Sequence, residues 1–360
     1  MMGRRGVLVV SLDFELFWGV RDSRTVLAYG PHVLGERLAI PEILRLFSRF
    51  GIHATWATLG FLFAVHKDEL MECCPSIKPS YANRRMSPYS YIASIGENED
   101  TDPLHFGLSL VDRIGGSANQ EIATHTFSHF YTLEAGADSA AFSADLEAAR
   151  KIAARRGYTT DSIVFPRNQY DQSALAVCRR QGIRAYRGTP PHPFYLPRPR
   201  GEESALVRIG RNLDSLLPLS GRNCHRLRPS AELLNIPASR FLYPHRRSEW
   251  LLVKRRLKRI SADITYAAQS GLVYHLWWHP HNFGLDVADN IALLAEILGV
   301  YARARDRYGM LSLNMRDCCA LARVDGSARC SVQTLGSYPK SVISVREGAA
   351  TSRSSDRSPQ

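Results

Sequence analysis

The sequence lacks the features of a membrane-spanning or disulfide-stabilised protein. No stretch of its 360 residues approaches the roughly 18 consecutive apolar residues of a transmembrane helix, and the apolar run at 7–12 is too short for a signal peptide core. The seven cysteines are odd in number and include adjacent pairs at 73–74 and 318–319, which do not suit a disulfide framework. We therefore expect a reduced, cytoplasmic chain with neither a signal peptide nor a transmembrane segment.

Acidic residues are scarce relative to basic ones. The chain has 34 Asp plus Glu against 46 Lys plus Arg, a net charge of +12, which favours acidic partners. No nucleic-acid-binding module is recognisable, so nucleic acid is not expected as a partner. The basic runs at 245–247 and 254–259 are by default a solvated helix face. The alternative is peripheral contact with an anionic membrane and recruitment of a phosphate- or lipid-carrier-linked sugar.

Short apolar runs alternate with amphipathic segments, a pattern typical of parallel α/β folds. Strands are expected at 7–12, 52–59, 121–124, 162–165, 183–186, 272–278 and 311–315. Helices are expected at 35–50 with Pro41 in the first turn, and at 62–73, 140–154, 173–181, 248–269 and 287–301. The pattern is interrupted near 75–104 and 189–245, which we interpret as long insertions in one domain over 1–320. The composition of 336–360 predicts a disordered tail.

Four of the expected strands end in polar side chains. These are Asp13 and Glu15, then His125 and His129, then the segment 167–170, and finally His275, His279 and His281. Ligands bind at the carboxyl ends of parallel strands, so these groups are expected around one rim. Each pair taken alone favours a structural role. Together, two histidines and a carboxylate suit a divalent metal, and a second carboxylate on the same side can act as general base on a metal-bound water.

The order of these motifs resembles the polysaccharide deacetylase family with a NodB-homology domain, carbohydrate esterase family 4. The matching segments are Asp-Phe-Glu at 13–15, His-Thr-Phe-Ser-His at 125–129, Arg-Asn-Gln-Tyr at 167–170 and Trp-Trp-His-Pro at 277–280. The resemblance spans roughly residues 7 to 315. It implies an α/β fold, namely a distorted (β/α) barrel of the NodB-homology type with long loop insertions. It also implies one divalent metal ion, usually Zn²⁺, and hydrolysis of an N-acetyl group on a saccharide.

The resemblance also implies a role for each matching residue. Asp13 is the general base, Glu15, His125 and His129 are the metal ligands, Arg167 holds and orients Asp13, Tyr170 offers its backbone N–H to the oxyanion, and His279 is the general acid. Trp277, Trp278 and His281 are expected near the sugar, with at least one of the two tryptophans packed in the core instead. His275 is expected to be a hydrogen-bonded core histidine.

The sequence departs from the family pattern at several positions. The carboxylate pair is Asp-Phe-Glu instead of Asp-Asp, so the base and the ligand are interchangeable between Asp13 and Glu15. Gln169 replaces the proline of the arginine motif, and Pro166 lies before the arginine instead. The aspartate-tryptophan segment that steadies the catalytic histidine is not found, and His281 is the alternative acid to His279.

The leading hypothesis is a metal-dependent hydrolase that removes an N-acetyl group from a saccharide during surface polysaccharide or glycoconjugate biosynthesis. A deformylase or cyclic-amide hydrolase on the same barrel is one alternative. A catalytically silent glycan-binding module is another, although the intact set of metal ligands argues against it.

Overall fold

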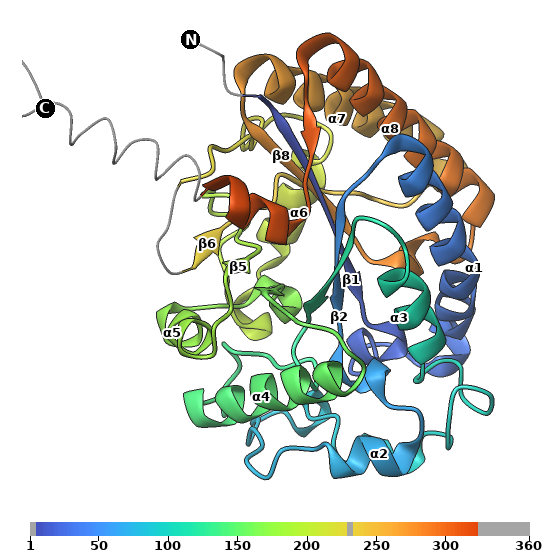
Figure 1. Ribbon diagram of the computed structural model, residues 1–360, viewed down its shortest axis with the longest axis vertical. Helices are drawn as coiled ribbons and strands as arrows, with labels where there is room; N and C mark the ends of the chain where they lie inside the picture. The colour runs from blue at the N-terminus through green and yellow to red at the C-terminus, as the bar shows by residue number, and fades with distance from the viewer. Residues whose placement is uncertain (1–4, 229–232, 323–360) are drawn as a thin grey trace, which may run out of the picture.

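Strand β1 (Val7–Phe14) lies in the middle of the sheet, and all eight of its residues are buried. An apolar run of this kind is covered on both faces, as a central strand of a parallel sheet requires. The computed structural model describes residues 5–228 and 233–322 (Figure 1). The tail predicted at 336–360 lies outside these described residues.

The sheet is parallel and follows the order β6-β5-β4-β3-β2-β1-β8-β7, with β9 paired to β1. The other strands are β2 (Ala54–Thr58), β3 (Gln120–Thr124), β4 (Ser162–Ile163), β5 (Ala185–Tyr186), β6 (Leu234–Asn235), β7 (Arg240–Phe241), β8 (Val273–Trp278) and β9 (Leu311–Ser312). Within the described residues no pairing joins β6 to β7, so the barrel is open. The predicted α/β fold class and distorted barrel agree with this architecture.

Helices alternate with the strands and cover the sheet (Figure 1). They are α1 (Val26–Phe50), α2 (Lys67–Glu72), α3 (Leu108–Gly115), α4 (Ser139–Arg155), α5 (Gln172–Arg180), α6 (Ala205–Asp214), α7 (Trp250–Ser270) and α8 (Val287–Tyr308). Helix α8 contacts both α1 and α7. Among the described residues, no helix combines the length and the apolar character needed to cross a bilayer.

Helix α1 begins earlier than the sequence pattern predicts. It starts at Val26, where the Thr25 hydroxyl accepts a hydrogen bond from the backbone N–H of Ala28, whereas the prediction began at residue 35. Leu27 is 93% exposed, so the first turns lack the buried apolar stripe on which the prediction depended. Pro41 therefore lies inside the helix instead of in its first turn.

The segment 189–245, interpreted from sequence as an insertion, contributes two strands to the sheet. Strand β6 pairs with β5, and β7 pairs with β8. Each of the two strands has only two residues, which is too short to produce a recognisable alternation of polar and apolar side chains. Helix α6 precedes both strands in the chain, between β5 and β6, and it too was absent from the prediction.

A backbone contact ties α1 to the turn that follows β8. That turn is a 3-10 helix, Pro280–Phe283, which comes directly after His279. A Cβ atom at Gly35 would lie 1.8 Å from the carbonyl oxygen of Gly284, and one at Gly284 would lie 1.9 Å from the carbonyl oxygen of His32. No side chain fits between these backbones, so glycine at both positions lets α1 approach the turn.

We expect Gly35→Ala to lower the free energy of unfolding by about 1–3 kcal/mol, because the added methyl group overpacks a backbone contact. Urea unfolding followed by circular dichroism measures the change. Gly299→Ala is the matched control, because Gly299 is also helical and its Cβ would meet only the Arg303 guanidinium, at 3.6 Å. The control should be neutral or stabilising by up to about 1 kcal/mol. Equal effects of the two substitutions would contradict this account of the contact.

Candidate active site

Side chains from five strands meet at the carboxyl edge of the sheet. Asp13 lies near the end of β1, and His125, Arg187 and His279 are the first residues after β3, β5 and β8. Arg167 belongs to the turn after β4. The parallel sheet therefore brings together groups that are far apart in the sequence, as expected from the polar strand ends.

Glu15, His125 and His129 form a buried cluster whose possible ligand atoms all lie within 4.8 Å of one another. The Nε2 atoms of His125 and His129 lie 3.2 Å and 3.0 Å from Glu15 Oε2. His125 Nδ1 lies 2.8 Å from the carbonyl oxygen of Val164 and donates its hydrogen to it, which leaves the lone pair on Nε2. The cluster therefore presents two imidazoles and one carboxylate toward a common point.

The loop that carries the two histidines is held in an unusual backbone conformation. Thr126 and His129 have φ values of 66° and 61°, in the left-handed region that non-glycine residues rarely adopt. The buried carboxylate of Asp145, on α4, accepts hydrogen bonds from the backbone N–H groups of Phe127 at 2.7 Å and Ser128 at 3.2 Å. These bonds fix the loop that directs both imidazoles toward Glu15.

Glu15 and Asp13 differ in what surrounds them. Burial raises the pKa of Glu15, but the charges of His279 and His129 and the close contacts with His125 and His129 outweigh it and hold that pKa well below its usual range. An anionic carboxylate between two imidazoles is a donor set that fits a divalent metal ion. Asp13 is absent from this ligand group, so the geometry distinguishes the two carboxylates that the sequence left interchangeable.

Asp13 is held by Arg187 in a bidentate ion pair. Arg187 Nη1 lies 2.6 Å from Asp13 Oδ1, and Nη2 lies 2.7 Å from Oδ2. The guanidinium is fully buried and lies over the Trp277 ring at 4.0 Å, and Asn168 Oδ1 accepts a further hydrogen bond from Nη2 at 3.0 Å. Burial raises the pKa of Asp13, but the charges of Arg187, His125 and His279 outweigh it and lower that pKa overall.

Arg167 does not make the expected contact with Asp13. Its guanidinium pairs with Asp22 and lies over the ring of Tyr131 at 4.2 Å. Arg167 has a φ of 54°, and this turn directs its side chain away from β1. Arg187 takes the place that the motif predicted for Arg167. The sequence feature that could have identified Arg187 is its position directly after the predicted strand at 183–186, because the other polar candidates also follow predicted strands.

His279 lies beside both carboxylates. Its Nε2 atom is 3.7 Å from Asp13 Oδ2 and 3.7 Å from Glu15 Oε1, and its side chain is 24% exposed. His281 stacks on His279 with ring centroids 4.9 Å apart, but it is buried, and burial lowers its pKa to about 3. His281 does not line the neighbouring cavity, and its role near a substrate stays a prediction.

The remaining predicted residues separate into core and cavity positions. Trp278 is fully buried and stacks on Phe283, so the structure excludes it from substrate contact, whereas Trp277 lines a cavity next to His279. His275 is a buried, hydrogen-bonded core histidine as expected, with Nδ1 near the Ile236 carbonyl oxygen and Nε2 near the Ser11 hydroxyl. The Tyr170 hydroxyl accepts a hydrogen bond from the Thr189 backbone N–H at 3.1 Å. Its role in stabilising an oxyanion stays a prediction.

Comparisons with known proteins find similar structures but no similar sequences. No family model and no curated protein matches the chain. A structure from Mycobacterium smegmatis, assigned as a polysaccharide deacetylase, has a TM-score of 0.55 and 12% identity, with 96% of each chain covered. The PuuE allantoinase has a TM-score of 0.53 and 10% identity, over 89% of this chain and 91% of the other.

A third structure, from Pseudomonas aeruginosa PAO1 and assigned as a polysaccharide deacetylase, has a TM-score of 0.52 and 11% identity. The match covers 88% of this chain and 90% of the other. At these identities the comparisons establish the fold alone. They confirm the deacetylase-type (β/α) barrel that the motif order predicted.

We expect Arg187→Gln to lower the free energy of unfolding of the metal-free protein by about 3–5 kcal/mol, because it leaves the Asp13 carboxylate buried without its partner. Arg167→Gln is the matched control. Its guanidinium is partly exposed and its partner Asp22 keeps a second arginine, Arg200, at 3.1 Å, so a loss of about 1 kcal/mol or less is expected. Chemical denaturation of both variants measures the difference. A loss from Arg187→Gln no larger than that from Arg167→Gln would show that the Asp13–Arg187 pair is not the support inferred here.

Proposed function

We propose that the protein is a metal-dependent hydrolase that removes an N-acetyl group from a saccharide. The observation that carries the proposal is the buried Glu15, His125 and His129 cluster, with Asp13 and His279 beside it. A metal-ligand set next to one ionised carboxylate and one partly exposed imidazole provides the groups that amide hydrolysis needs. The fold shared with polysaccharide deacetylases supports an acetylated saccharide as the substrate.

The donor set fits one divalent ion, and we propose Zn²⁺ because two imidazoles and a carboxylate with open positions are typical of catalytic zinc sites. When bound, such an ion supplies Lewis acidity to the amide carbonyl and to water. Glu15, His125 and His129 would hold it. The hydrogen bond from His125 Nδ1 to Val164 orients one of these ligands before any ion binds.

The proton transfers are assigned to Asp13 and His279. Asp13 stays ionised beside Arg187 and accepts the proton of the attacking water at a carboxylate oxygen. The water oxygen bonds to the carbonyl carbon, and the C–N bond then breaks. His279 donates a proton from its imidazole to the leaving nitrogen, which departs as an amine, and acetate is the second product. The exposed side of His279 faces the cavity from which a saccharide would enter.

A cyclic-amide hydrolase is the second candidate, because one of the similar structures described above is an allantoinase. The same base, acid and metal ligands would serve a ring amide. Acetate release separates the candidates, since a cyclic amide gives one product and no acetate. A glycan-binding module without activity would release neither product. We further propose a cytoplasmic location and a role in building surface polysaccharide or glycoconjugates.

We expect Asp13→Asn to lower kcat for acetate release from N-acetyl saccharides by about 10²–10⁴-fold while the bound metal content is retained. Glu15→Gln and His125→Ala should lose the metal itself. Metal content is measured by plasma mass spectrometry, and acetate by an enzyme-coupled assay. Metal loss in Asp13→Asn with full occupancy in Glu15→Gln would reverse the assigned roles. Unchanged acetate release in all three variants would refute the proposed function.

We also propose that the protein contacts an anionic membrane through the outer face of α6. Leu206, Ile209 and Leu213 lie along this face with exposed fractions of 77%, 53% and 46%, an apolar stripe that no described residue covers. Arg208 is exposed on the same helix. Exposed leucines on a helix with basic neighbours suit an interface between lipid tails and anionic headgroups.

Helix α7 adds basic charge close to α6. Arg256 Nε donates to the Ser215 hydroxyl at 3.1 Å, so it ties α7 to the C-terminal end of α6. Lys254, Arg255 and Lys258 are exposed on α7. The basic run at 254–259 therefore has two parts, one that binds the neighbouring segment and one that faces solvent. The second part supplies the charge complementary to an anionic surface, where a carrier-linked sugar would be found.

We expect the full chain to co-sediment with vesicles containing phosphatidylglycerol and not with pure phosphatidylcholine vesicles. The double variant Leu206→Gln with Ile209→Gln should bind at least about tenfold more weakly, because two apolar side chains are lost from the interface. Leu38→Gln on α1, where the leucine is 69% exposed, is the matched control and should bind like the unaltered chain. Light scattering that shows a dimer dissolved by the double variant would instead identify this face as a contact between two copies.

A further inference from the structure

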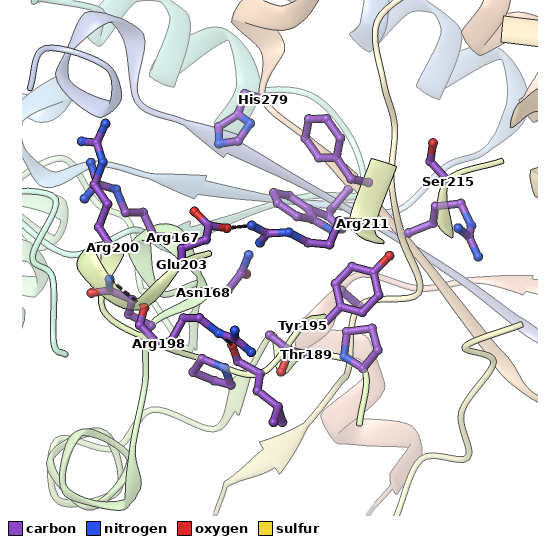
Figure 2. Close-up of a pocket in the computed structure, with 18 of the residues that line it drawn as sticks. Arg167, Asn168, Thr189, Tyr195, Arg198, Arg200, Glu203, Arg211, Ser215 and His279 are labelled. Carbon is purple, nitrogen blue, oxygen red and sulfur yellow. Dashed lines mark hydrogen bonds and ion pairs between the residues drawn. The ribbon is translucent and has the colours of Figure 1, made fainter. Parts of the chain in front are cut away.

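A cavity of about 510 Å³ opens beside His279. Figure 2 shows that its walls come from the turn after β4, the segment 189–200, helix α6 and the ends of β7 and β8. His279 and Trp277 lie on the wall nearest the metal-ligand cluster. The cavity therefore adjoins His279, the proposed general acid, and its volume suits a sugar with a substituent.

The walls of this cavity are rich in guanidinium groups. The charged arginine and acidic side chains that line it are Arg167, Arg198, Arg200, Arg211, Arg240 and Glu203. Asp22, which pairs with Arg167 and Arg200, is buried behind the wall, and so is Asp214, which lies 3.7 Å from Arg240. The arginines thus separate these acids from the cavity, and Glu203 is the one carboxylate among the lining residues.

Several guanidinium donors make no hydrogen bond and have only long ion-pair contacts. Arg240 is 5% exposed, and its Nε and Nη2 atoms make no hydrogen bond among the described residues, although Nη2 lies 3.6 Å from Asp263 Oδ2. The buried Nη1 of Arg167 makes none either and lies 3.9 Å from Glu134 Oε1. Buried donors without acceptors are costly and are rarely left unpaired without reason. An anionic ligand in the cavity would supply acceptors to this wall.

Arg198 is the cation of the cavity that lacks a carboxylate partner within the described residues. Its Nε and Nη2 atoms donate to the backbone carbonyls of Leu196 and Pro193, which hold the side chain in place. Arg211, opposite, pairs with Glu203. Arg198 and Arg211 line the same cavity. Burial lowers the pKa of Arg211, and the like charge of Arg198 adds to that effect. Figure 2 shows both side chains in the cavity.

Aromatic side chains complete the walls of the cavity. Tyr195, Phe241 and Tyr243 line it together with Trp277. Rings of this kind pack against the apolar faces of sugars, while guanidinium forks bind the oxygens of phosphoryl and carboxylate groups. The two kinds of surface in one cavity match a ligand that has both a ring and an anionic group.

We propose that this cavity binds an oxyanion group, phosphoryl or carboxylate, carried by the saccharide substrate, with Arg198 and Arg211 as its main ligands. That the ligand is a saccharide rests on the proposed function. The oxyanion site adds the expectation that a charged substrate is preferred over a neutral one. The acetamido group would then lie at the metal-ligand cluster while the anionic group lies against α6.

The test compares three substrates of the metal-loaded full chain: N-acetylglucosamine 1-phosphate, N-acetylglucosaminuronic acid and the neutral methyl glycoside of N-acetylglucosamine. We expect kcat/KM for one or both anionic substrates to exceed that for the neutral glycoside. Arg198→Gln should reduce this preference by about tenfold or more, mainly through KM, as the loss of a charge-assisted hydrogen bond predicts. Arg198→Lys should restore part of it. The two anionic substrates distinguish a phosphoryl from a carboxylate ligand.

Arg45→Gln is the control, because Arg45 is an exposed residue of α1 that pairs with Glu42 away from the cavity. It should leave the preference unchanged. Calorimetric titration of inorganic phosphate and glucuronate into the protein without substrate gives a readout independent of turnover. Thermal unfolding of each variant verifies folding.

The outcomes separate the two proposals. Deacetylation of all three substrates with equal efficiency, unaffected by Arg198→Gln, overturns the oxyanion site and leaves the proposed function intact. Arg198-dependent binding of phosphate or glucuronate without any acetate release supports the oxyanion site and refutes the deacetylase. Anion binding that Arg198→Gln and Arg211→Gln leave unchanged also overturns the proposed site.

Discussion

The ion pair between Asp13 and Arg187 is the interaction on which the site depends. Both side chains are buried at the centre of the sheet, where an unpaired charge would be severely destabilising. The pair joins β1 to the residue after β5, two strands that are not neighbours in the sheet, and so it bridges the curled interior. Because Arg187 binds both carboxylate oxygens of Asp13, Glu15 is the carboxylate that faces the two histidines. The different surroundings of the two carboxylates are thus a consequence of where one arginine lies.

The loop at 125–129 shows how the fold holds a conformation that its sequence does not favour. Two residues with positive φ would be unstable in an isolated peptide. Here Asp145 accepts two backbone hydrogen bonds from the loop, and burial raises the pKa of that carboxyl group to about 6 despite them. Helix α4 therefore has a part in the site although none of its residues belongs to the metal-ligand cluster. The hydrogen bonds that hold the loop of the two histidines come from a residue outside the cluster.

Much of the fold and the metal-ligand cluster could be predicted from local sequence, because buried strands and closely spaced ligands leave local patterns. Strand β1 and the His-Thr-Phe-Ser-His segment are examples. Arg187 could not be distinguished from Arg167 in this way, since the choice depends on backbone turns and on which strand curls toward Asp13. The two-residue strands β6 and β7 carry no periodicity at all. The arginines of the cavity were hidden for a similar reason, because they come from separate segments that only the folded chain brings together.

The cations of the cavity wall are arginines, and this choice of side chain has a consequence for how the protein responds to its surroundings. A guanidinium group stays protonated at any pH that a cell experiences, whereas imidazole and carboxyl groups change charge within or near that range. The charge of these arginines is therefore independent of cellular pH. In the proposed function, ligand recognition would depend on the guanidinium groups and the chemistry on carboxylate and imidazole groups, so that one could fail while the other persists.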